Sequence, residues 1–267
     1  MVRTIALAAT AATVVACGSP AGGPPRNTTT GPTVRLSERE PLGWLALAPG
    51  RVARFVPREA AAAAYVPWGE DIEAGLASGG ELDALDAAPG ARPHRVRVGT
   101  ATKVKYGCDD NRLDVVPLAG PSFREGVVWV LPPGGAAAWT PAAMAITVKS
   151  STPKQRAFAI GGVALTLTAT DPMHGVLQIS RDGTTVLTVD FEHGAMEGDE
   201  SELDLAGGVG VPEPVAAWRL GEGADAPLLV ATATPSHEGV HLAAYLVEAR
   251  MSREVDAMTR YLYLCAF

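Results

Sequence analysis

Five residues near the C-terminal end have the types and spacing that metal chemistry requires. His237-Glu238-Gly239-Val240-His241 fits the pattern H-E-x-x-H. On a helix, histidines four positions apart lie on one face, where both imidazoles can bind a single zinc ion. The glutamate between them can then act as general base on the metal-bound water. The pattern therefore predicts a zinc site with His237 and His241 as ligands and Glu238 as the catalytic base.

This pentapeptide resembles the signature of the zincin metallopeptidases, and the resemblance covers these five residues alone. It implies a zinc-dependent hydrolase. The flanking sequence favours another local structure, because Leu228–Thr234 and Val240–Val247 both have the apolar character of strands. Pro235 and Gly239 are typical of turns, and Gly239 is unfavourable inside a helix. We therefore expect a hairpin turn and no cofactor here, with the zinc hydrolase as the alternative function.

Two further groups of residues contain metal-binding side chains. Cys108-Asp109-Asp110-Asn111 and Asp114 offer oxygen atoms that suit calcium, but they lack the ligand spacing and the glycine of a calcium loop. We interpret this group as a polar turn after a strand. His174 and His193 would form a joint site with His237 only if the fold brings them together, and we expect separate histidines.

The tryptophans divide into two groups by their neighbours. Trp129 lies within the apolar run Val127–Leu131 and Trp44 within an apolar run near the N-terminal end, so both are predicted to be core residues. Trp68 and Trp139 stand beside proline or glycine in loop-like sequence. Exposed aromatic rings suit carbohydrate faces and partner surfaces, so these two are the candidate binding aromatics.

The first residues have the features of an export signal. Met1-Val2-Arg3 is a short basic start, and the apolar, uncharged run after it is too short to cross a bilayer. Val14-Val15-Ala16-Cys17 then resembles the lipobox of bacterial lipoproteins. That resemblance implies that residues 1–16 are removed and that Cys17 is lipidated as the first mature residue.

The resemblance to lipoproteins also implies a location. We expect an exported protein that is held at the membrane by the lipid on Cys17 and faces the periplasm or the cell surface. Gly18 is compatible with sorting to the outer membrane. Residues 17–34 are rich in Gly, Pro and Thr and are predicted to be a flexible tether.

The remaining composition restricts the partners and suggests one covalent link. The formal net charge is −7 and no run of basic residues occurs, so nucleic acid is excluded as a partner. With Cys17 lipidated, Cys108 and Cys265 form an even pair in an oxidising compartment, where disulfides persist. We expect a disulfide between them, and an envelope protein or a glycan as the partner.

The fold class follows from many short strand patterns and few helical ones. Apolar or alternating runs bounded by Gly and Pro predict strands at 95–106, 112–117, 127–131, 158–168, 176–180, 186–191, 228–233, 242–247 and 261–265. Asp182-Gly183 is a strong hairpin signal. Short helices are predicted after Pro57, at Asp71–Ala77 and at Ser252–Met258.

These elements predict a mainly β protein with an antiparallel sandwich or barrel-like body and a few short helices. Pro132-Pro133-Gly134-Gly135 is the best internal boundary, so we expect two packed β-rich domains, at 35–133 and 139–267. Because no catalytic set is complete in the sequence, we expect a non-enzymatic binding or structural role.

Overall fold

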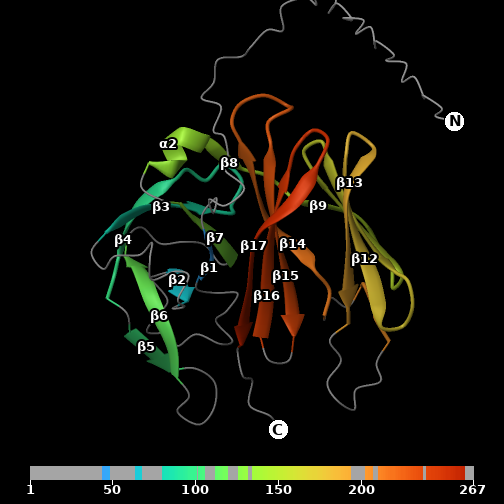
Figure 1. Ribbon diagram of the computed structural model, residues 1–267, viewed down its shortest axis with the longest axis horizontal. Coiled ribbons are helices and arrows are strands. Elements are labelled where there is room, and N and C mark those ends of the chain that lie inside the picture. The colour runs from blue at the N-terminus through green and yellow to red at the C-terminus, as the bar shows by residue number, and fades with distance from the viewer. Residues whose placement is uncertain are drawn as a thin grey trace, which may run out of the picture. The chain divides into compact units, whose positions relative to one another are not determined.

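The computed structural model describes the backbone of residues 44–48, 64–67, 80–100, 102–105, 112–119, 126–131, 134–193, 202–206, 210–236 and 239–261. Residues Val34–Phe267 form one compact unit. Within the described part, the strands form three antiparallel sheets and one short helix is present (Figure 1). The prediction of a mainly β, antiparallel fold is confirmed. No helix among the described residues has the length and apolar character needed to cross a membrane.

The first sheet, sheet A, comes from the N-terminal half of the chain. Its strands are β1 (Trp44–Ala48), β2 (Ala64–Pro67), β3 (Glu81–Asp86), β4 (His94–Val98), β5 (Thr102–Lys105), β6 (Arg112–Ala119) and β7 (Gly126–Leu131). They are ordered β2-β1-β7-β3-β4-β6-β5, and β2 also pairs with β6, which closes the sheet on itself. The strand predicted at 95–106 is two strands, β4 and β5, and both pair with β6.

The second sheet, sheet B, combines one short strand with the C-terminal strands. Its members are β8 (Pro141–Ala143), β14 (Glu213–Leu220), β15 (Leu228–Ser236), β16 (Gly239–Val247) and β17 (Ser252–Tyr261), in the order β17-β16-β15-β14-β8. The helix predicted at Ser252–Met258 is wrong, because this segment pairs with β16 along its length. The pairing satisfies the backbone of β17 through its neighbour, which overrides a weak amphipathic helical pattern.

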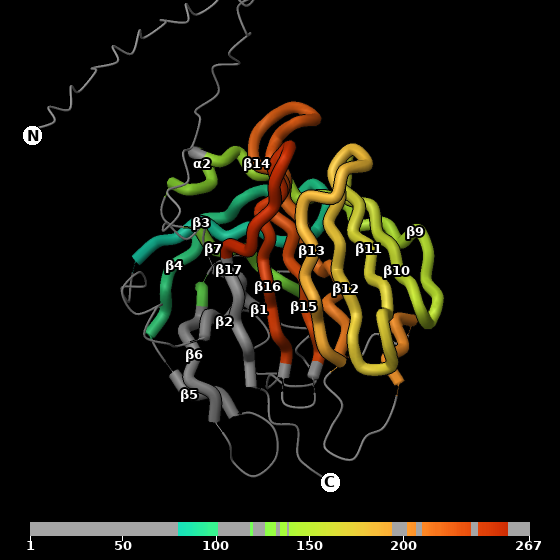
Figure 2. The backbone as a smooth tube through the Cα atoms, turned by 45° about the vertical axis from the view of Figure 1, so that its right-hand side comes forward, coloured from blue at the N-terminus to red at the C-terminus, as the bar shows by residue number. Residues whose placement is uncertain are grey.

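The third sheet, sheet C, is a simple up-and-down arrangement. Its members are β9 (Thr147–Ser151), β10 (Gln155–Ile160), β11 (Val163–Ala169), β12 (His174–Arg181) and β13 (Thr184–Glu192), in the order β13-β12-β11-β10-β9. Figure 2 shows these strands side by side as one layer. The predicted hairpin at Asp182-Gly183 is confirmed: both residues have positive φ, 50° and 80°, as a two-residue turn of the primed type requires.

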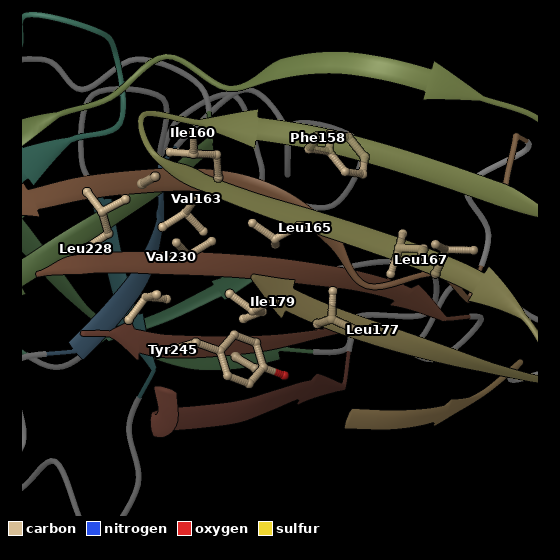
Figure 3. Packing of buried hydrophobic residues seen from close by; sticks show 14 of the residues in the cluster. Phe158, Ile160, Val163, Leu165, Leu167, Leu177, Ile179, Leu228, Val230 and Tyr245 are labelled. Carbon is tan, nitrogen blue, oxygen red and sulfur yellow. The ribbon is translucent and has the colours of Figure 1, made fainter. Parts of the chain in front are cut away.

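Sheet B is the central layer because both of its faces are buried. One face packs on sheet C to form the first core, in which Leu165, Ile179, Val230 and Tyr245 meet (Figure 3). Burial in this core is the main cause that raises the pKa of Tyr245 to about 12; Glu254 adds to the effect and Thr232 opposes it.

The opposite face of sheet B forms the second core with sheet A. There Leu85 and Trp129 from sheet A pack with Trp218 and Leu246 from sheet B. The rings of Trp129 and Trp218 are 5.6 Å apart between centroids, and both side chains are buried. Residues from both sides of the predicted boundary at 133–139 therefore share one core.

The short helix α2 (Gly135–Trp139), which the sequence did not predict, follows that boundary directly. Its Ala136 N–H donates to Oδ2 of Asp83 at 3.1 Å, so a buried carboxylate of sheet A holds the start of the helix. The helices predicted after Pro57 and at Asp71–Ala77 lie outside the described residues.

Candidate functional site

The backbone around the H-E-x-x-H pentapeptide is a β-hairpin. Strands β15 and β16 pair in register up to Ser236 and Gly239, so the segment runs from strand to strand with two residues between them. Those two residues, His237 and Glu238, lie outside the described part. His241 is an exposed residue of β16 opposite Thr234. The turn predicted from Pro235 and Gly239 is thus confirmed at the level of the strands.

This hairpin removes the physical reason for a zincin-type site. Histidines at positions i and i+4 share a face in a helix because 3.6 residues make one turn. His241 is in a strand, where alternate residues share a face, and its pairing places it inside the ladder of sheet B. The described strands therefore lack the helical geometry that would bring two imidazoles and a glutamate to one metal ion.

The other predicted residues with covalent or binding roles lie outside the described part of the chain. These are Cys17, Cys108, Asp109, Asp110, Asn111, Cys265 and Trp68. The lipid attachment, the disulfide and the exposed tryptophan at 68 therefore stay predictions. For the calcium group, the structure gives the backbone of β6, which contains Asp114, and its pairing with β5.

His174, on β12, and His193, which follows β13, occupy different environments. His174 is exposed, and its Nδ1 lies 2.9 and 3.0 Å from the carboxylate oxygens of Asp171. His193 is buried, and its backbone N–H donates to the Met173 carbonyl at 2.7 Å. Within the described residues, no group of three or more His, Cys, Asp or Glu side chains is placed to hold a metal ion.

Asp171 organises the turn between β11 and β12. Its Oδ1 accepts hydrogen bonds from the backbone N–H groups of Met173 and His174, both at 2.8 Å. The Met173 bond, followed by the hydrogen bond to the His174 side chain, lowers the pKa of Asp171. Asp171 in turn raises the pKa of His174 through the same side-chain hydrogen bond and its charge. The Asp171–His174 pair therefore stabilises the turn.

Trp129, Trp139 and Trp218 all take part in core packing. Trp129 is buried, as predicted from its apolar run. Trp139 is partly buried and packs against the second core, so its ring is not freely exposed. Trp218, which no sequence pattern marked as a core residue, is fully buried, and its Nε1 donates to the Asp86 carbonyl at 3.2 Å.

Buried and partly buried arginines connect sheet C to sheet B. The Arg181 guanidinium donates to the carbonyls of Val247, Ala224 and Ala226 at 3.2, 3.0 and 3.1 Å. Arg156 pairs with Glu213 at the start of β14. Both charges are therefore used in holding two layers together.

The outer face of sheet C is made mostly of polar side chains. We define this outer face by the strand positions that alternate with the core residues: Thr147, Ser150, Gln155, Ala157, Ala159, Ala164, Thr166, Thr168, His174, Val176, Gln178, Ser180, Thr185, Thr188, Asp190 and Glu192. Each of these side chains is exposed or half-buried. Most carry a hydroxyl or amide group, and the ionisable residues among them are His174, Asp190 and Glu192 at one end of the face.

The register aligns these side chains across all five strands. One row runs Thr188, Gln178, Thr166, Ala157, Ser150 from β13 to β9. The Ser180 and Thr185 hydroxyls lie 3.3 Å apart, which confirms that neighbouring strands direct side chains to the same side. The alternation of the sequence was visible beforehand, but only the register shows that the polar positions form one continuous surface.

Comparisons of the chain with models of known protein families, with curated proteins and with solved structures give no match. The outer face of sheet C is the candidate functional site because its polar positions form one continuous surface across five strands.

Proposed function

We propose that this chain is an exported, lipid-anchored binding protein of the bacterial cell envelope, and that it presents the outer face of sheet C to its partner. The observation that carries the binding role is the continuity of this face: five strands expose mostly uncharged polar side chains in aligned rows. Sheet B lies behind sheet C and is covered on both sides, so it serves as a rigid support.

The anchoring part of the proposal rests on the sequence. The basic start, the short apolar run and Val-Val-Ala before Cys17 support export and lipidation. A lipid on Cys17 would attach the chain to a membrane while residues 17–34 give the body reach. Gly18 supports the outer membrane as the destination, with the body facing the periplasm or the cell surface.

Metabolic labelling with radioactive palmitate tests the anchor in the natural host or in a bacterium that processes lipoproteins. The wild-type chain is expected to incorporate label and to partition into the detergent phase, whereas Cys17→Ser removes both properties. Cys108→Ser is the matched control, because it deletes a cysteine without touching the lipobox. Equal labelling of the wild type and Cys17→Ser would refute the anchor.

A further inference from the structure

We draw no further inference here: the strongest candidate, the exposed side-chain cluster of Asp171, His174 and Glu192 at one end of sheet C, belongs to the β11–β12 turn that Asp171 and His174 stabilise, and nothing in the described part of the chain points to a ligand for it.

Discussion

Arg181 is a buried cation whose described hydrogen-bond acceptors are three backbone carbonyls in sheet B and the β14–β15 connection. A buried guanidinium is stable only when its N–H groups have acceptors. The same hydrogen bonds satisfy the carbonyls of Ala224 and Ala226, which lie in the β14–β15 connection and outside the strand ladders. Arg181 therefore fixes the end of the β12–β13 hairpin to the layer beneath.

We expect Arg181→Met to lower the free energy of unfolding by about 2–4 kcal/mol, because three carbonyls lose their donor in a buried site. Urea denaturation measures this value from the midpoint at constant slope. Arg250→Met removes an exposed arginine and should change stability by less than about 0.5 kcal/mol. A similar small effect at both positions would contradict the clamping role of Arg181.

The Asp171–His174 pair predicts a pH dependence with a defined sign. The pKa of His174 is raised above its ordinary 6.5, so its stabilising contribution is complete below that value and is lost as the pH rises through the folded pKa. The pKa of Asp171 is lowered below 3.8, so its contribution is present above that value and is lost as the pH falls through the folded pKa.

The turn is therefore most stable between the two ordinary values, in mildly acidic solution. An NMR titration of the histidine ring protons should give His174 a pKa above 6.5. Asp171→Asn should return that pKa toward its ordinary value. An unchanged titration curve in the variant would show that the pair does not form in solution.

At the scale of elements, sheet C could be predicted in part: β9 was missed, and the stretch predicted at 158–168 is two strands, β10 and β11, which turn at Gly161-Gly162. Leu165 and Leu167 alternate with polar residues because sheet C has one buried and one exposed face, and period two is then visible in the sequence. Sheet B is covered on both faces, so its strands are apolar almost throughout and lose that period. The strands of sheet B were indicated only by the length of their apolar runs and by the turn residues that bound those runs.

Strand β14 was missed for a local reason. Pro212 and Pro214 surround Glu213 and suggest a loop, but Pro212 lies just before the strand and Pro214 is its second residue, where proline is tolerated. A register shift follows between Pro214 and Ala216. The fully buried Trp218 lies on this strand, so the miss also hid the ring that joins sheet A to sheet B.

The candidate site could not be predicted for a physical reason. Thr166 and Thr188 are separated in the sequence and have no motif that connects them. They become neighbours in a row only through the pairing of β11 with β12 and of β12 with β13. The H-E-x-x-H spacing, in contrast, was visible at once, but His241 lies in strand β16 and not in the helix that the zincin signature requires.

Strand β9 is an edge of sheet C among the described residues, and Val148 on it is 52% exposed. Such edges invite pairing with other chains, and a lysine on the edge opposes this. We expect Lys149→Val to increase aggregation at neutral pH, measured by light scattering during incubation. Lys149→Arg keeps the charge and should behave like the wild type. Equal scattering from all three proteins would contradict a protective role for Lys149.

At the scale of the whole molecule, Trp218 connects the layers. It packs on Trp129 and donates to the Asp86 carbonyl in sheet A. We expect Trp218→Phe to cost about 1–3 kcal/mol of unfolding free energy, from the lost hydrogen bond and the smaller ring. Trp139→Phe, at a partly buried position, should cost less. Urea denaturation compares the two, and an equal or larger loss at Trp139 would be against this role.

The two-sided burial of sheet B has a consequence for any break in the backbone. In the sequence, sheet A precedes residues 132–133 and helix α2 follows them. Both contribute residues to the second core, which contains Trp218. A chain cut at that point would leave two fragments that each expose half of a shared interior. Those fragments should recognise each other and reassemble without a covalent link, much as a split reporter does. Each fragment would need the other to bury the residues of the second core.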